Sequence, residues 1–324
     1  MADDAPLNLH ERRLCVIVNA KSGRREGAGL TEKLRDLLAP KVAQFELRPL
    51  RKGSRIDEQI RRAVKDGFDL IAVLGGDGTQ SAAADALAGT DAVMAVLPGG
   101  TFNFFARDLG VGDTVDQALE TLLNGQVRRI DVGDVNGRVF LNNTSFGAYP
   151  DILEKRESFY RRFGRSRIGA YWTVLTTLTQ LRRPLVLHAR VNGEMKDFET
   201  GLAFVAKNAY QIESLGLDGA EALREDRLAV FIARATGGWG LIGAALRLAF
   251  GLSARERDFD LICSRDLIIE TRPDKRLIAR DGEKERMPGP FHLKVRPDAL
   301  SVVVPLPDPD GGEEVGTDRA GITA

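Results

Sequence analysis

The sequence predicts an α/β protein with a mostly parallel sheet in an N-terminal domain and a β-rich, antiparallel, sandwich-like second domain. Up to about residue 130, short apolar runs alternate with helical segments, the pattern of parallel α/β units. Beyond that point, short strand-like runs follow one another beside turn signals such as Asp281-Gly282. A chain of 324 residues is also long enough for two domains.

In the first domain, buried strands are expected to alternate with helices. Apolar runs bounded by turn residues predict the strands, and amphipathic spacing or capping residues predict the helices. Thr114 and Gln117 form a capping box for the last helix, which is expected to end near Gly125. The predicted strands are 13–18, 44–47, 69–74 and 92–97, and the other helices are 30–38, 54–64 and 81–88.

The second domain is expected to consist of short strands interrupted by two helical insertions. The strand-like runs are 139–141, 185–191, 202–206, 228–232, 266–270 and 276–279, and the insertions are 166–181 and 239–250. We place the first domain at residues 12–131 and the second at 132–294. The polar residues 1–11 and the Asp/Gly/Pro-rich residues 306–324 are expected to be disordered.

Composition argues against several classes of protein. Lys plus Arg and Asp plus Glu are 46 each, so no basic field favours nucleic acid as a partner. No apolar stretch reaches the roughly 18 residues of a membrane span, and the N-terminus lacks a signal core, so a cytoplasmic protein is expected. Cys15 and Cys263 lie in apolar runs, which favours buried free thiols over a disulfide or a metal site.

A glycine-rich loop at residues 75–79 follows one predicted strand and precedes a helix. This arrangement favours anion binding, because unpaired backbone N–H groups and the helix dipole point out of the helix start. Glycine allows a close approach of backbone and phosphate. The carboxylate of Asp77 would repel a phosphate, however. Two interpretations stay open: Asp77 acts through Mg²⁺ or water, or it is a turn residue that caps a helix.

Two further glycine-bearing loops, at 19–29 and 98–101, are expected at the same edge of the sheet. Ligands of parallel sheets bind at the carboxyl ends of the strands, where all three loops would meet. The first loop lacks the spacing Gly-x4-Gly-Lys-Ser/Thr, which excludes a P-loop but not a phosphate contact.

A second motif narrows the choice among protein families with such glycine loops. It spans residues 97–107, Leu-Pro-Gly-Gly-Thr-Phe-Asn-Phe-Phe-Ala-Arg. They resemble the Pro-x-Gly-Thr-x-Asn-x-x-Ala-Arg signature of the diacylglycerol kinase catalytic family, which includes bacterial soluble lipid kinases and sphingosine kinases. The 75–79 loop alone is not specific, because nicotinamide-dinucleotide kinases and phosphofructokinases have similar loops. The resemblance extends from Val16 to about Val304 and includes the motifs at 19–23, 130–133, 140–143 and 281–283.

This resemblance implies an ATP-binding α/β domain, a β-sandwich-like second domain and an active cleft between them. It also implies that the final strand, about 295–305, returns to the first domain. In the family, the glycine loops bind ATP. The corresponding residues here are Asn19, Ser22, Gly23, Gly75, Gly76, Asp77, Gly78, Thr79, Gln80, Ser81, Gly99, Gly100, Thr101 and Asn103.

The late acidic motif supplies the general base in the family, which corresponds to Glu283, with Asp281 beside it. Phosphoryl transfer needs charge neutralisation and in-line positioning, and a carboxylate near the acceptor hydroxyl can take its proton. From the residues alone, a hairpin turn with a solvated glutamate is the alternative.

The resemblance also implies Mg²⁺ at two places. Asp77 and Asp131 correspond to a carboxylate–water–metal network in which the family often has a further Asp, where this chain has Phe104. Leu223, Asp226 and Leu228 correspond to a structural Mg²⁺ site made of hard oxygen ligands. Arg227 stands where relatives usually have Gly, and an ordinary turn is the alternative there.

The sequence therefore predicts an ATP- and Mg²⁺-dependent lipid kinase that acts on a lipid hydroxyl, most simply that of diacylglycerol. The alternatives are a catalytically weak or inactive lipid- or nucleotide-binding protein of the same fold, and an NAD kinase. Peripheral membrane contact is expected through the cation- and aromatic-rich residues 155–167 or the apolar residues 239–250. A solvated basic face and a buried helix are the respective alternatives. The sequence leaves a homo-oligomer open.

Overall fold

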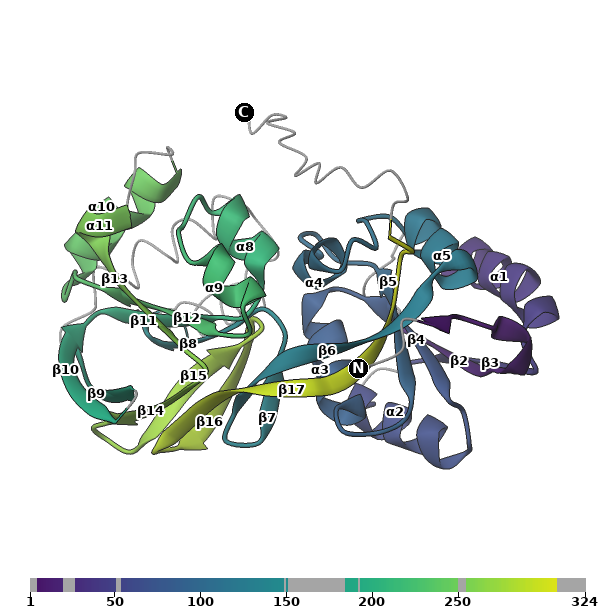
Figure 1. Cartoon of the computed structure of the whole chain (residues 1–324), viewed down its shortest axis with the longest axis horizontal. Helices are drawn as coiled ribbons and strands as arrows, with labels where there is room; N and C mark the ends of the chain where they lie inside the picture. The colour runs from purple at the N-terminus through teal and green to yellow at the C-terminus, as the bar shows by residue number, and fades with distance from the viewer. Residues whose placement is uncertain are drawn as a thin grey trace.

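The computed structural model describes residues 5–19, 27–50, 54–148, 150, 184–191, 193–249 and 255–307. Two lobes are joined by two long strands, β6 (Gln126–Val135) and β17 (Phe291–Val304), which pass from one lobe into the other (Figure 1). The two strands pair antiparallel, with a register shift between Arg296 and Leu300.

The first lobe is a parallel α/β domain. Its sheet has the order β3-β2-β4-β5, all parallel, and the end of β17 pairs parallel with β5. Strands β4 and β5 are buried along their whole length, because helices cover such sheets on both faces. The elements are β2 (Arg13–Val18), α1 (Gly27–Leu38), β3 (Gln44–Pro49), α2 (Ile56–Lys65), β4 (Leu70–Gly75), α3 (Asp77–Leu87), β5 (Val93–Pro98), α4 (Phe104–Asp108) and α5 (Val115–Asn124). The predicted capping box of Thr114 and Gln117 is present at α5.

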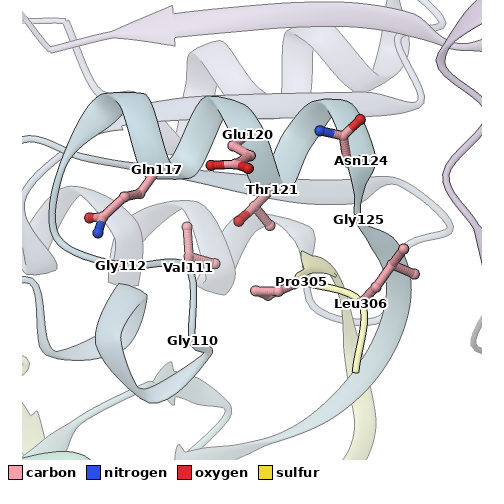
Figure 2. Close-up of a pocket in the computed structure, with 10 residues that line it drawn as sticks. All are labelled: Gly110, Val111, Gly112, Gln117, Glu120, Thr121, Asn124, Gly125, Pro305 and Leu306. Atoms are coloured by element: carbon pink, nitrogen blue, oxygen red, sulfur yellow. The ribbon is translucent and has the colours of Figure 1, made fainter. Parts of the chain in front are cut away.

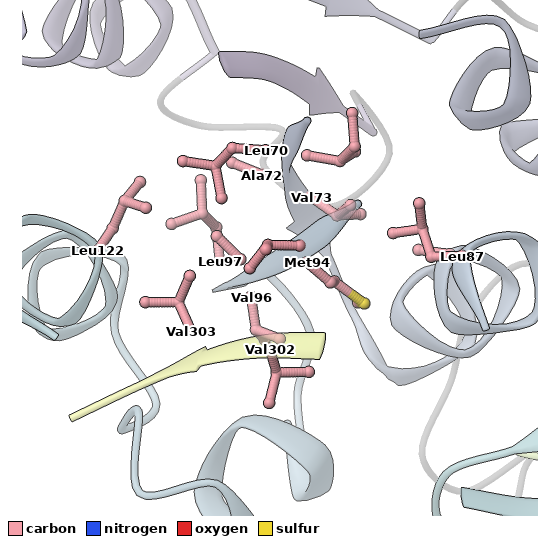
Figure 3. Packing of buried hydrophobic residues seen from close by; sticks show 14 of the residues in the cluster. Leu70, Ala72, Val73, Leu87, Met94, Val96, Leu97, Leu122, Val302 and Val303 are labelled. Atoms are coloured by element: carbon pink, nitrogen blue, oxygen red, sulfur yellow. The ribbon is translucent and has the colours of Figure 1, made fainter. Parts of the chain in front are cut away.

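The core of this lobe packs sheet residues against helix residues (Figure 3). Leu97 of β5 and Val303 of β17 lie towards Leu122 of α5, whereas Met94 lies on the side of Leu87 in α3. These side chains are almost fully buried. Truncating such a residue to Ala typically costs roughly 2–5 kcal/mol, so this packing fixes the strand ends that carry the glycine loops.

The second lobe is made of antiparallel strands in two sheets. One sheet has the order β13-β12-β11-β8-β15-β16, and the other, β10-β9-β14-β17, continues through β17 into the first lobe. The predicted fold class is thereby confirmed. The elements are β7 (Arg138–Phe140), β8 (Asn143–Gly147), β9 (Leu185–Val191), β10 (Glu194–Thr200), β11 (Leu202–Ala206), α8 (Ala209–Ser214), α9 (Ala220–Arg224), β12 (Leu228–Ala233), α10 (Gly238–Ala249), α11 (Arg255–Asp258), β13 (Phe259–Ser264), β14 (Asp266–Thr271), β15 (Lys275–Arg280) and β16 (Glu283–Pro288).

Aromatic side chains form part of the core between these two sheets. Phe146 of β8 meets Phe291 of β17 edge to face, with ring centroids 4.9 Å apart. Phe140 packs on the backbone of β6 so closely that a Cβ at Gly133 would lie 2.4 Å from its ring. The glycine of the 130–133 motif is therefore required by packing next to the junction of the lobes.

The N-terminal segment differs from the expected disorder. Ala5–Pro6 forms a short strand, β1, on β6, and Leu9–Glu11 forms a 3₁₀ turn. Leu7 and Leu9 are buried against the first lobe. Disorder was expected because residues 1–11 are mostly polar. Leu7 and Leu9, two positions apart, nevertheless pack against the edge of the core. Strands β8, β10, β13 and β16 were also not predicted, because their sequences are polar or mixed. The expected helix at 166–181 lies outside the described residues.

Among the described residues, no helix combines the length and apolarity that crossing a bilayer requires. Helix α10, within the expected apolar segment 239–250, packs only one side against the lobe. Leu241 and Ala244 are buried there, whereas Trp239 is 75% exposed.

The two thiols should differ in reactivity. Cys15 is fully buried in β2, and burial raises its pKa to about 12. At pH 8 its thiolate fraction is then about one in ten thousand. Cys263 is partly exposed, although burial raises its pKa as well. We expect iodoacetamide at pH 8 to modify Cys263 in the native protein and Cys15 only after unfolding, as read by peptide mass spectrometry. Equal native rates would contradict this packing of β2.

Candidate active site

The first glycine loop turns β4 directly into α3. Gly76 is the N-cap of α3, and its carbonyl accepts hydrogen bonds from the N–H groups of Thr79 and Gln80. A Cβ at Gly75 would lie 2.4 Å from the Thr79 methyl, so only glycine fits this turn. The first N–H groups of α3 thus emerge at the carboxyl end of β4, where the helix dipole favours an anion.

The second glycine loop lies against the first. A Cβ at Gly100 would lie 2.7 Å from the Cα of Gly76, so the two backbones are in van der Waals contact. Gly99 also donates its N–H to the carbonyl of Gly75 at 2.9 Å. The loops form one surface at the carboxyl ends of β4 and β5, and Thr101 is exposed on it.

Two asparagines predicted to contact ATP brace these loops. The side chain of Asn19 donates to the Thr79 hydroxyl at 2.9 Å and so ties the end of β2 to α3. Asn103 is buried with φ of +51°, and its Oδ1 accepts the Gly100 N–H at 2.9 Å. Ser22 and Gly23 lie outside the described residues.

Gln80 and Ser81 are buried and point away from the loop surface. The Gln80 side-chain nitrogen donates to the carbonyls of Val73, Gly75 and Leu97, at 2.8, 3.2 and 3.2 Å, and so clamps β4 to β5. The Ser81 hydroxyl bonds the carboxyl group of Asp281 in the other lobe. Both side chains therefore stabilise the site from the buried side of the glycine loops.

Asp281 and Gly282 form the two-residue turn between β15 and β16, with φ of +47° and +80°. The Asp281 carboxylate is 7% exposed and accepts three backbone N–H bonds, from Leu141, Asn142 and Asn143, at 2.8–2.9 Å. Burial raises the pKa of Asp281, while these donors and Ser81 act in the opposite direction. The role of Asp281 in this arrangement is to fix the hairpin on residues 141–143.

Glu283 extends from this hairpin towards the first glycine loop. A Cβ at Gly78 would lie 3.1 Å from Glu283 Oε1, so the carboxylate sits against the first turn of α3. Glu283 is exposed, in contrast to Asp281. The fold therefore places a solvent-accessible carboxylate from the second lobe beside the helix N-terminus of the first.

Asp77 is the first residue of α3, and its carboxylate faces the other elements of the site. Its Oδ1 accepts the Phe105 N–H in the first turn of α4 at 3.3 Å and the side-chain amide of Asn142 at 3.4 Å. The carboxylate therefore caps the neighbouring helix α4 through Oδ1. Mg²⁺ binds through one or two carboxylates when phosphates complete its shell, so Asp77 fits a nucleotide-borne ion.

Residues 142, 143, 208 and 211 form a buried polar cluster between the lobes that the sequence analysis did not identify as functional. Asn208 donates its side-chain N–H to Asn142 Oδ1 at 2.8 Å, and Asn143 donates to Gln211 Oε1 at 2.9 Å. Asn142 and Asn143 belong to the motif at 140–143. Two amide side chains directly after an apolar run were the sequence signal that could have identified them.

Asp131 lies in a different part of the junction, in a cavity of about 640 Å³ behind α4. Its Oδ1 accepts the N–H of Asp298, in the bulge of β17. Lys207 also lines the cavity; burial lowers the pKa of Lys207, and Asp131 is the main group that opposes this shift. Phe105 and Leu141 line the same cavity.

The predicted magnesium site at Leu223, Asp226 and Leu228 has a cation beside it already. Arg265 Nη2 lies 3.5 Å from Asp226 Oδ2, and both leucine side chains are buried. Within the described part of the chain, no group of three or more His, Cys, Asp or Glu side chains is arranged to hold a metal. This magnesium site stays a prediction, and phosphoryl transfer at the glycine loops does not depend on it.

A second cavity, of about 350 Å³, lies on the first lobe between the loop after α4, helix α5 and the end of β17 (Figure 2). Gln117, Thr121 and Pro305 line it, and none of the predicted site residues does. The glycine loops, Asp77 and Glu283 therefore remain the candidate site.

Comparison with known proteins agrees with this geometry. Residues 13–135 match the diacylglycerol kinase catalytic domain. Over this segment, the chain is similar to the diacylglycerol kinase catalytic family. The match covers the glycine loops, Asp77 and Asp131, and it ends before Glu283 and the second lobe.

Individual relatives carry names of the same kind. A diacylglycerol kinase of Bacillus subtilis is 41% identical over 88 residues, which are 26% of this chain and 29% of that protein. A probable lipid kinase, YegS-like, of Pseudomonas syringae pv. tomato is 35% identical over 190 residues, 57% of this chain and 59% of that protein. The aligned regions thus span well under two thirds of these relatives.

A solved structure shares the whole architecture. The crystal structure of a diacylglycerol kinase from Bacillus anthracis str. Sterne superimposes with a TM-score of 0.69 over 92% of this chain and 98% of that one. Its sequence is 23% identical, so the likeness shows a shared fold.

Proposed function

We propose that this protein is an ATP- and Mg²⁺-dependent lipid kinase that transfers the γ-phosphate to a lipid hydroxyl, that of diacylglycerol or a related lipid. The observation that carries the proposal is the position of the Glu283 carboxylate beside the first turn of α3 at Gly78. A base from the second lobe and an anion site from the first are needed together for phosphoryl transfer. The family of the chain and the names of its relatives support this assignment.

The residues of this chain would divide the work as follows. The N–H groups at the start of α3 and the Gly99–Gly100 loop would hold the phosphates, and Asp77 would hold the ion that accompanies them. Mg²⁺ supplies neutralisation of the phosphate charge when it is bound. Glu283 would accept the proton of the lipid hydroxyl as that oxygen bonds to the γ-phosphorus, while the bond from this phosphorus to the bridging oxygen breaks and ADP leaves.

A lipid-panel kinase assay tests the proposal. Purified protein is incubated with γ-labelled ATP and mixed micelles of diacylglycerol, sphingosine, ceramide or phosphatidylglycerol, with NAD⁺ as a parallel acceptor. We expect label in at least one lipid. Label in NAD⁺ alone would instead establish an NAD kinase.

The second candidate function is a catalytically weak or inactive binding protein, which Phe104 favours. It stands where the family often has Asp, and it stacks in parallel on Phe102 with ring centroids 5.3 Å apart. ATP or lipid binding without turnover on the whole panel would favour this function.

We further propose that helix α10 contacts the membrane that holds the substrate, in a protein located in the cytoplasm. Trp239, Ile242 and Leu246 share one face of α10, and Trp239 and Leu246 are 75% and 53% exposed. The one charged residue of this helix, Arg247, is paired with Asp258. An exposed apolar stripe with an aromatic residue suits a bilayer surface. The cation-rich residues 155–167 lie outside the described residues.

Replacing Trp239 and Leu246 together with Asp should weaken binding to phosphatidylglycerol-containing vesicles by about 10²- to 10⁴-fold, since burying such side chains is worth roughly 1.5–3 kcal/mol each. Vesicle co-sedimentation measures this. Leu306→Asp is the control, because Leu306 is similarly exposed but follows β17 on the first lobe. Equal binding by all three proteins would remove α10 from the contact.

A further inference from the structure

Asn142 occupies the point where the two lobes meet at the candidate site, and it is only 2% exposed. Its backbone N–H is donated to Asp281 Oδ1 at 2.8 Å, and its carbonyl accepts the N–H groups of Lys207 and Asn208. These bonds hold the backbone of Asn142 from both sides. Because the residue is buried, its side chain has few alternative rotamers.

The side chain of Asn142 connects two groups that do not touch each other. Its Nδ2 lies 3.4 Å from Asp77 Oδ1 in the first lobe, and its Oδ1 accepts the Asn208 amide at 2.8 Å in the second. The carboxamide donates to the carboxylate and accepts from Asn208 at once, whereas an ionised Asp could only accept. Asn and not Asp is thus required at position 142 for this connection.

Helix α8 sets the far end of this connection. Asn208 is its N-cap, and Asn208 Oδ1 accepts the Gln211 N–H at 2.6 Å. The same helix contacts α4 through Tyr210, whose hydroxyl accepts from Arg107 at 2.9 Å and whose N–H is donated to Asp108. The placement of α8 is thereby transmitted through Asn208 and Asn142 to Asp77.

We propose that Asn142 is a positioning residue that aims Asp77 at the nucleotide-bound cation and couples this orientation to the second lobe. Asp77 Oδ1 accepts from Asn142 and from the Phe105 N–H, so these two donors restrict the rotamer of the carboxylate. Losing such a support typically costs about 10- to 100-fold in metal affinity or activity. This inference rests on the proposed role of Asp77 in nucleotide binding.

The test measures the affinity for ADP by calorimetry in EDTA and in Mg²⁺, and the readout is the ratio of the two dissociation constants. It needs no lipid substrate. Asn142→Ser shortens the side chain, so that its hydroxyl cannot bridge Asp77 and Asn208 as the carboxamide does. We expect the ratio of the dissociation constants in EDTA and in Mg²⁺ to fall by about 10-fold, with ADP binding in EDTA nearly unchanged.

Asn143→Ser is the matched control. Asn143 is adjacent, similarly buried and also bonded to Asp281, but its amide faces Gln211 and not Asp77. It should lower the melting temperature without changing the ratio. Equal losses in EDTA and in Mg²⁺ for Asn142→Ser would show a structural role only and overturn the inference.

Asp77→Asn separates this inference from the proposed function. If it lowers the ratio and Asn142→Ser does not, Asn142 does not position Asp77. If Asp77→Asn leaves the ratio unchanged, the proposed role of Asp77 fails, and the inference fails with it.

Discussion

Glu283→Gln should lower the rate of phosphoryl transfer by about 10²–10⁴-fold while leaving ADP affinity and the melting temperature close to those of the unmodified protein. The amide has the same shape as the carboxylate but cannot accept the proton of an acceptor hydroxyl. Because Glu283 is exposed, its substitution should not disturb the packing of the hairpin. Initial rates with γ-labelled ATP, calorimetry with ADP and thermal unfolding measure the three quantities.

Glu194→Gln serves as the control for Glu283→Gln. Glu194 is also an exposed glutamate at the start of a hairpin strand, β10, and it contacts none of the site residues described above. Its activity should equal that of the unmodified protein. Full activity in Glu283→Gln would remove the base from the proposed mechanism.

Asp281→Asn should destabilise the protein by about 2–4 kcal/mol, because its amide nitrogen would replace Oδ2, leave the buried Leu141 N–H without its acceptor and add a buried donor beside it. Asparagine tolerates the left-handed backbone, so the turn itself should survive. Since Glu283 follows two residues later, activity should fall together with stability. Urea unfolding gives the free-energy change, and the lipid kinase assay gives the activity.

Asp298→Asn is the matched control for this substitution. Asp298 has a φ of +46°, almost the same as Asp281, but its side chain is exposed in the β17 bulge. A change of no more than about 0.5 kcal/mol is expected there. If the two variants were equally stable, the bonds to Leu141, Asn142 and Asn143 would not support the hairpin.

The strands and glycine loops of the first lobe were predictable because their signals are local. A fully apolar run such as 70–74 can be buried on both faces only in a covered sheet, and the glycines that follow permit the turn into α3. The second lobe was less accessible to sequence reasoning. β10 and β16, for example, are polar along much of their length and are strands because of their partners β9 and β15.

The sequence by itself determined the fold class and the position of the glycine loops at the ends of the strands. Backbone conformation decides these features, and Gly75, Gly76 and Gly100 encode it directly. Tertiary structure alone separated Asp281 from Glu283, neighbours in one motif, into a buried support and an exposed carboxylate. It also brought Asn142 to Asp77, and Asn208, 66 positions along the chain, to Asn142. Such contacts depend on how the lobes dock, which no local pattern specifies.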